Sequence, residues 1–238
     1  MKYTYFRLVL AVWLFLGGWQ IVSAETNELM VRCVAFYNLE NVFDTIHDEG
    51  KNDYEYLPDG GMKWTSLKYT NKIQNMAYAI AQLGTDEDPR GAAIVGVSEV
   101  ENIGCLHDLC KELKEKHNRN YVPILLEGPD RRGIDVGLLY NPDMFKPVGK
   151  PKGYELKAHY ADGGVVRSRL QLWVSGYMLD DSRKIVMDKI HISVNHWPSR
   201  SGGEESSRAT RDTAAMLVKQ VADSIYMKEP RAKIIVMG

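Results

Sequence analysis

The chain has 238 residues and carries 30 Lys and Arg against 31 Asp and Glu, a formal net charge of −1 at pH 7. This balance argues against a protein that holds nucleic acid through bulk positive charge, although it is compatible with an enzyme that uses a few local arginines. Cys33, Cys105 and Cys110 are too few for a disulfide scaffold, so we expect small buried residues and do not favour a Cys105–Cys110 bridge. The length suits one large α/β domain with a proper core.

The start of the chain predicts a cleaved secretory signal peptide over residues 1–24. Lys2 and Arg7 give a positive start, residues 8–16 are apolar, and Val22 and Ala24 stand where a cleavage site needs small residues. The alternative is an uncleaved N-terminal anchor, although the apolar run is too short to span a bilayer. We therefore expect a monomeric domain over residues 25–238, exported to the periplasm or the outside of the cell, with no stable membrane insertion after signal cleavage.

The rest of the chain mixes apolar runs typical of strands with helical spacing. A strand is expected over residues 31–37, and a continuous apolar run predicts another, covered on both faces, over residues 92–97. Apolar residues at helical spacing predict helices over residues 65–83, 105–116 and 204–228. Further strands are expected over residues 121–126, 134–140, 168–178, 184–194 and 232–237, with 168–178 and 184–194 as an antiparallel pair.

The order of these elements limits the fold class. It does not alternate as a (β/α) barrel or a dinucleotide-binding fold would, and no GxGxxG motif or P-loop is present. The chain also has no internal repeat and no low-complexity linker. We expect one domain of α/β class, of the α+β type, in which a sheet or a pair of sheets is covered by helices.

Three of the expected strands run into side chains suited to phosphate-ester hydrolysis. The first strand leads to Asn38 and Glu40, the strand over 92–97 leads to Glu99, and the strand over 184–194 leads to His196. Ligands in α/β sheets gather at one end of the strands, where loops hold side chains on a rigid base. A carboxylate, an amide and an imidazole in these places could form one metal-assisted hydrolytic site.

Glu99 is the strongest candidate metal ligand, because it follows a buried run and Mg²⁺ prefers one or two carboxylates together with water and phosphate oxygens. Glu101 could take the same role, since the sequence does not separate the two. Glu40 could complete the metal's shell, and Asn38 could orient a phosphate oxygen or a water. Ordinary solvated acids and a turn-forming Asn are the structural alternatives.

His196 stands in a stiff loop, because Pro198 restricts the preceding residue to extended conformations. An imidazole there can protonate a leaving oxygen or donate to a developing phosphorane charge, and the alternative is a structural histidine. Arg200 and Asn195 flank it and would suit phosphate recognition, as would Arg132 in a turn before the strand over 134–140. The other members of a dispersed basic set are Arg131, Arg167, Arg169, Arg208 and Arg211.

Together these segments resemble the endonuclease/exonuclease/phosphatase superfamily, the metal-dependent phosphodiesterases that include deoxyribonuclease I. The resemblance rests on FYNLEN at residues 36–41, IVGVSEVEN at 94–102, GIDVGLLY at 133–140 and NHWPSR at 195–200. These motifs are short, but they stand in the family's order and spacing, from about residue 31 to the end of the chain. Secreted bacterial members with an Asn-His-Trp-x-Ser-Arg segment are the relatives it suggests.

The resemblance implies a four-layer sandwich of two facing mixed β-sheets flanked by helices. It implies that Glu99 binds Mg²⁺ or Mn²⁺ with Asn38 and Glu40 nearby, and that His196 contacts the scissile phosphate or assists the leaving group. The implied chemistry is in-line attack of an activated water on a phosphate ester, with the metal offsetting charge on the phosphoryl oxygens. The leading expectation is thus an exported metal-dependent phosphoesterase, an endonuclease or exonuclease.

Two alternatives remain open from the sequence. A phospholipid or a small phosphate ester could be the substrate instead of nucleic acid. The family's next motif, Gly-Asp-x-Asn, begins at Gly238, where this sequence ends, so the resemblance implies a C-terminally truncated chain that is inactive by itself. If the gene product ended there, a non-catalytic phosphate-binding protein would be the expectation.

Overall fold

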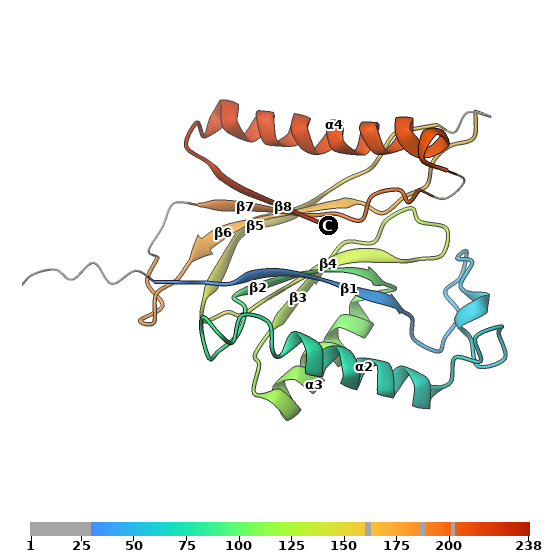
Figure 1. Cartoon of the computed structure of the whole chain (residues 1–238), viewed down its shortest axis with the longest axis horizontal. Coiled ribbons are helices and arrows are strands. Elements are labelled where there is room, and N and C mark those ends of the chain that lie inside the picture. Colours follow the sequence, from blue (N-terminus) through green and yellow to red (C-terminus); the bar gives the residue numbers. More distant parts are fainter. Residues whose placement is uncertain (1–29, 160–162, 186–188, 201–202) are drawn as a thin grey trace, which may run out of the picture. The chain divides into compact units, whose positions relative to one another are not determined.

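A computed structural model describes residues 30–159, 163–185, 189–200 and 203–238 (Figure 1). The predicted signal peptide lies outside the described residues. The chain divides into residues 1–30 and a compact unit over residues 31–238, and this second unit contains the two sheets and their helices. Within the described residues, no helix is long and apolar enough to cross a membrane.

The first sheet has four strands in the order β1-β2-β4-β3. The strands are β1 (Val34–Val42), β2 (Ile94–Val100), β3 (Val122–Leu125) and β4 (Asp135–Tyr140). β1 and β2 are parallel, whereas β4 runs antiparallel to both β2 and β3, so the sheet is mixed. β2 and β4 are buried on both faces, which explains their continuous apolar sequences.

The second sheet also has four strands, in the order β5-β6-β7-β8. They are β5 (Phe145–Tyr154), β6 (Gln171–Met178), β7 (Ile190–Val194) and β8 (Lys233–Met237). β5, β6 and β7 are antiparallel neighbours, and β8 adds parallel to β7. The expected pair over 168–178 and 184–194 is therefore present, but its paired part is shorter at both ends.

In the described part of the chain, three α-helices and one 3₁₀ turn accompany the sheets: α2 (Ser66–Ile80), α3 (Ile103–His117), α4 (Glu204–Lys228) and η1 (Tyr54–Tyr56). α2 begins after Thr65, whose side chain accepts a hydrogen bond from the backbone of Lys68. α3 begins after Asn102, which accepts from the backbone of Cys105, and it ends at Asn118 in the left-handed conformation. These caps place the helix boundaries where the sequence provides the capping side chains.

The elements form four layers (Figure 1). α2 and α3 lie on the outer face of the first sheet, and α4 lies on the outer face of the second. The inner faces of the two sheets meet in a core that includes Ile94, Leu138, Phe145, Ile192 and Val194. The sheets approach closely at Gly96, where an added Cβ would lie 2.3 Å from Met237 Sδ. The expected sandwich of two mixed sheets flanked by helices is confirmed.

Some predicted boundaries were wrong. The first strand continues through residues 38–41 to Val42, because a shift in its pairing lets it rejoin β2 beyond its polar residues. β5 was not predicted, since its sequence FKPVGKPKGY lacks the alternation typical of strands and contains two prolines. β7 begins only at Ile190. α4, in contrast, has the predicted bounds, and Cys105 and Cys110 are buried and free, as expected.

Candidate active site

Two adjacent bulges shape the end of the first sheet where the predicted site residues lie. The pairing of β1 with β2 shifts between Asn38 and Val42, and the pairing of β2 with β4 shifts between Ser98 and Val100. Within these bulges Glu40 has φ 56° and Glu99 has φ 60°, both in the left-handed region. Residues other than glycine rarely adopt this conformation, and it persists where the surroundings enforce it, often at functional sites. Bulges of this kind redirect side chains next to active sites.

The carboxylate of Glu99 is the meeting point of the three strand ends. Asn38 Nδ2 donates a hydrogen bond to Glu99 Oε1 over 3.1 Å, and His196 Nε2 lies 3.2 Å from the same oxygen. The side chains of His196 and Glu99 are 23% and 18% exposed, so the site is held by its surroundings but is open to a ligand. The structure thus brings together an amide, a carboxylate and an imidazole from β1, β2 and the segment after β7.

The local environment disfavours a positive charge on His196. Burial lowers the pKa of its imidazole below the ordinary value, and the neighbouring Arg169 guanidinium lowers it further. The Glu99 carboxylate acts in the opposite direction but does not reverse the shift. In the neutral ring, an Nε2–H that faces Glu99 can donate to it, and the same N–H can serve an incoming oxygen.

Arg169 connects the His196 segment to the loop before β4. Its guanidinium donates to the backbone oxygens of His196 and Trp197 over 2.9 and 3.2 Å, and to Asp130 Oδ2 over 3.2 Å. Asp130 is 6% exposed, and its other carboxylate oxygen accepts from the backbone N–H of Arg132 over 2.9 Å. A single buried cation therefore holds together the two segments that carry His196 and Arg132.

The sequence did not single out Asp130, and it named Arg169 only as one member of a dispersed basic set. Asp130 precedes the GIDVGLLY segment, and Arg169 lies just before β6, so they are far apart along the chain. No local pattern marks an arginine that binds carbonyl oxygens of a distant loop. The one feature of the sequence that could have pointed to this pair is the position of Asp130, an acid in a turn directly before two arginines.

The other predicted site residues lie around this centre with different partners. Glu40 follows Asn38, whose Oδ1 accepts from the Glu40 backbone N–H over 2.9 Å, but the Glu40 carboxylate pairs with Lys72 Nζ of α2 at 3.5 Å. Its side chain is 75% exposed, so it is free to turn toward a ligand. Arg132 forms an ion pair with Asp130, with its Nε 3.8 Å from Asp130 Oδ1, and Asp130 in turn contacts Arg169.

Asn195 and Arg200, on either side of His196 in the sequence, differ in their exposure to solvent. Asn195 is 2% exposed, and its amide donates to Ser193 Oγ and to the backbone oxygen of Met237, each over 3.0 Å. Its Oδ1 is buried with no hydrogen-bond partner in the described part of the chain. These contacts tie the start of the His196 segment to β8, while Arg200 is exposed at the other end of the segment.

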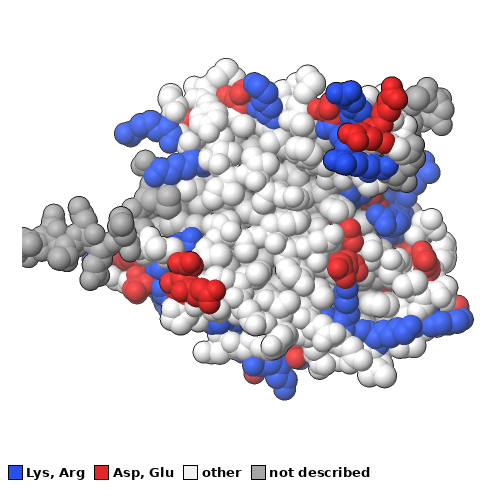
Figure 2. All heavy atoms as spheres, viewed as in Figure 1, with Lys and Arg blue, Asp and Glu red and all other residues white. Residues whose placement is uncertain are grey.

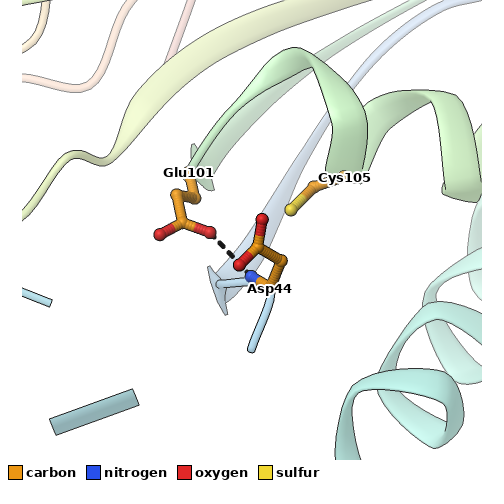
Figure 3. Close-up of side chains that lie close together, drawn as sticks. All are labelled: Asp44, Glu101 and Cys105. Carbon is orange, nitrogen blue, oxygen red and sulfur yellow. Dashed lines mark hydrogen bonds between the residues drawn. The ribbon is translucent and has the colours of Figure 1, made fainter. Parts of the chain in front are cut away.

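A second acidic group lies behind the first. Ligand atoms of Asp44, Glu101 and Cys105 lie within 4.8 Å of one another and could hold a metal ion (Figure 3). Glu101 Oε2 accepts from the backbone N–H of Asp44 over 2.7 Å, and Asn102 Nδ2 donates to Asp44 Oδ2 over 3.1 Å. Burial raises the pKa of Glu101 to about 8 and that of the Cys105 thiol to about 12. The group includes a thiol, whereas hard cations such as Mg²⁺ prefer oxygen ligands, and its hydrogen bonds support the loop after β1.

The structure separates Glu99 from Glu101, which the sequence could not do. Residues two apart on a regular strand share a face, so both carboxylates would point to the same side. The left-handed conformation at Glu99 interrupts that alternation. Glu99 consequently faces Asn38 and His196, whereas Glu101 is 3% exposed and faces Asp44.

The surface charge agrees with the near-neutral composition. Figure 2 shows Lys and Arg interspersed with Asp and Glu on this face of the molecule, around a broad area without charged side chains. Substrate binding by a continuous basic surface finds no support on this face.

The chain is similar to known proteins in sequence and in fold. Residues 33–238 match the model of the Endonuclease/Exonuclease/phosphatase family. Among solved structures, a member of that family from Bacteroides vulgatus is 17% identical with a TM-score of 0.43, and covers 79% of this chain and 59% of its own. A family protein from Bacteroides thetaiotaomicron is 16% identical with a TM-score of 0.45, and covers 85% of this chain and 60% of its own.

A mannosyl-6-phosphatase from Bacteroides thetaiotaomicron is 16% identical with a TM-score of 0.44, and covers 81% of this chain and 59% of its own. The chain therefore spans about 60% of the length of these structures. No curated protein matches the chain in sequence. Because the family model covers residues 33–238, nearly all of the chain, this protein belongs to the Endonuclease/Exonuclease/phosphatase family.

Proposed function

We propose that this protein is a metal-dependent phosphoesterase that cleaves phosphodiester bonds, with nucleic acid as its leading substrate class. Its superfamily generally hydrolyses phosphate ester bonds with the help of divalent metal ions. The observation that supports the proposal is the convergence of Asn38 Nδ2 and His196 Nε2 on one oxygen of Glu99, at an accessible end of the sheet. Amide, carboxylate and imidazole are the groups that such a hydrolysis needs.

Glu99 and Glu40 would hold the metal, Mg²⁺ or Mn²⁺. They fit a hard cation because both are carboxylates, both stand in adjacent bulges, and both are open to the solvent that such ions retain as ligands. When bound, the ion supplies charge compensation for the phosphoryl oxygens and lowers the pKa of a bound water. The Asp44, Glu101 and Cys105 group offers a thiol and a buried acid instead, and fits this ion less well.

The chain's own side chains take the remaining roles. His196 donates its Nε2 proton to the leaving oxygen or to charge on the phosphoryl group. Asn38 orients Glu99 and a phosphate oxygen, while Arg132 and the exposed Arg200 bind phosphate. Asn195 helps to position the His196 segment, because its amide donates hydrogen bonds to Ser193 Oγ and to the Met237 carbonyl oxygen.

The cellular setting of this activity is part of the proposal. The signal-like start of the sequence, residues 1–24, supports export to the periplasm or the outside of the cell, without stable membrane insertion after cleavage. A monomeric protein is a further part of the proposal. A phospholipid or small phosphate ester is the alternative substrate class. The net charge of −1 supports this alternative, because the chain carries no excess positive charge that would favour a polyanion.

Removal of divalent metal tests the function. The gene product is expected to hydrolyse bis(p-nitrophenyl) phosphate and DNA with Mg²⁺ or Mn²⁺, to lose this activity in EDTA and to regain it when metal is restored. A panel of DNA, RNA, phospholipid and sugar phosphate identifies the substrate, and a steep loss of rate with salt would favour a polyanion. Hydrolysis that EDTA does not change would contradict the proposal. Metal and phosphate binding without turnover would point to a non-catalytic role.

Arg169 is expected to act as a positioning residue for His196. Changing Arg169→Met removes its bonds to the His196 and Trp197 carbonyls, and a displacement of about 1 Å in a catalytic group can cost about a hundredfold in rate. We expect kcat to fall about 10- to 100-fold with little change in KM. Arg169→Lys should recover only part of the lost kcat, because an ammonium lacks the planar arrangement of N–H donors of a guanidinium.

The exposed Arg167 provides the matched control, since Arg167→Met removes an equal charge near the same strand. Its kcat should stay near the unmodified value. An Arg169→Met enzyme with unchanged kcat, measured by the same assay, would show that the position of His196 does not depend on the hydrogen bonds from Arg169.

A further inference from the structure

A separate pocket opens on the outer face of the second sheet, beneath the last turns of α4. Its volume is about 410 Å³, within the range of small-molecule sites. β5 creates the opening: residues 149–151 stand opposite the single residue Val174 of β6, and Gly149 in this bulge has φ 73°. The bulge interrupts the pairing of β5 with β6 at the edge of the pocket, which Trp173 and Ser175 of β6 also line.

The pocket carries an excess of positive charge. Lys150, Lys152, Lys189 and Lys228 line it, against the single acid Glu229. Glu229 is already neutralised, because it pairs with Lys189 Nζ at 2.5 Å and with His191 Nε2 at 3.3 Å, contacts that lower its pKa. Within the described residues, Lys150, Lys152 and Lys228 have no carboxylate within 4.0 Å. Three lysines thus face the opening without a counter-charge, in a chain whose net charge is −1.

The walls between these lysines are apolar and aromatic. Tyr154 of β5 and Val221 and Ile225 of α4 form one side. Trp173 lies at the base, 5% exposed, and its Nε1 is buried without a hydrogen-bond partner in the described part of the chain. Ser175 Oγ and His191 Nδ1 lie 2.8 Å apart on the same surface. A buried donor without an acceptor is unfavourable, so an acceptor that reached Trp173 would be stabilised.

This pocket is distinct from the candidate active site. None of its lining residues belongs to the Asn38, Glu99 and His196 centre. His191 and His196 are five residues apart on an extended segment, which corresponds to about 16 Å. His191 also faces α4, on the outer side of the second sheet. The donors in the pocket therefore serve no step of the proposed hydrolysis.

We propose that this pocket, the lysine pocket, binds a small organic anion. Its phosphate or carboxylate group faces Lys150, Lys152 and Lys228, and its apolar body rests against Tyr154 and Ile225. The lining supports this choice because four of its five lysine and acidic side chains are cationic, which disfavours cations, while the apolar wall favours an organic anion over an inorganic ion of the same charge. The last carbonyls of α4 oppose an anion only weakly, since Lys228 lies in that turn.

Calorimetric titration of the full chain in EDTA tests the proposal with phenyl phosphate, benzoate, inorganic phosphate and the neutral benzyl alcohol as probes. We expect phenyl phosphate or benzoate to bind more tightly than inorganic phosphate, with benzyl alcohol not binding. Whichever of the two aromatic anions binds more tightly shows whether the pocket prefers a phosphate or a carboxylate. The indole N–H resonance of Trp173, assigned with Trp173→Phe, should shift during the same titration.

Variants locate the binding. The exposed pair Lys150→Gln and Lys152→Gln should raise Kd about tenfold when combined, because two charges that attract the anion are removed and each contributes modestly at an exposed position. Lys111→Gln with Lys114→Gln on α3 removes the same charge from the opposite layer and should leave Kd unchanged. Glu99→Gln should also leave Kd unchanged, which separates this site from the proposed active site. No binding of either aromatic anion, or a Kd insensitive to the Lys150 and Lys152 pair, would overturn the proposal.

Discussion

Replacing Glu99 by Gln in the whole gene product is expected to reduce phosphodiester hydrolysis by about a thousandfold while leaving the fold intact. The amide keeps the size of the side chain but removes the charge that would hold a divalent metal, and such electrostatic contributions are commonly worth about 10²- to 10³-fold in rate. The Asn38 Nδ2 bond to Oε1 can persist, because the Gln carbonyl still accepts it. Steady-state kinetics with Mg²⁺ would measure the loss in kcat.

Two comparisons make this prediction specific. Glu115→Gln on the exposed face of α3 removes an equal charge and should leave kcat unchanged. Mn²⁺ binding, followed by electron paramagnetic resonance, should weaken in Glu99→Gln but not in Glu115→Gln, which gives a readout besides activity. Full activity of Glu99→Gln would remove Glu99 from the site.

The backbone at Glu99 adds a stability signature. Because φ is 60° there, Glu99→Gly relieves a conformation that costs a non-glycine residue about 1 kcal/mol. The lost contacts to Asn38 and His196 oppose this gain by a similar amount. We therefore expect a thermal midpoint near that of the unmodified protein together with a large loss of activity, as for a residue retained for function.

Replacing His196 by Asn is expected to lower kcat by about 10²- to 10³-fold, the usual contribution of a positioned proton donor. The size of the loss should depend on the leaving group. A p-nitrophenolate leaving group needs little protonation, so its ester should be less sensitive to His196→Asn than an alkyl phosphodiester or DNA. Parallel kinetics on the two substrate types measure this difference.

His107→Asn on α3 is the matched control for this substitution, because His107 is exposed and lies in the opposite layer. Its kinetics should match those of the unmodified protein for both substrates. An equal loss for both leaving groups in His196→Asn would assign His196 to binding phosphoryl charge and not to proton transfer. No loss for either would exclude it from the reaction.

The sequence predicted the elements whose side chains follow their own periodicity. α4 has a repeated apolar face and has its predicted bounds at residues 204–228, and β2 and β4 are continuous apolar runs because both of their faces are buried. β5 escaped prediction because its pairing depends on β6 and not on its own composition. Strand formation there is a tertiary effect, which local propensity does not contain.

The candidate site divides in the same way. The sequence alone suggested Asn38, Glu99 and His196, because polar side chains directly after buried strands lie at the end of the sheet, where functional groups gather. The sequence by itself determined the family, the residue types of the candidate site and the strands that carry them. Only the tertiary structure decided that Glu99 and not Glu101 faces His196, since one left-handed residue breaks the strand's alternation. It also decided that Arg169 and Asp130 brace the site, because their contacts join segments far apart in the chain, and such pairings have no local signature.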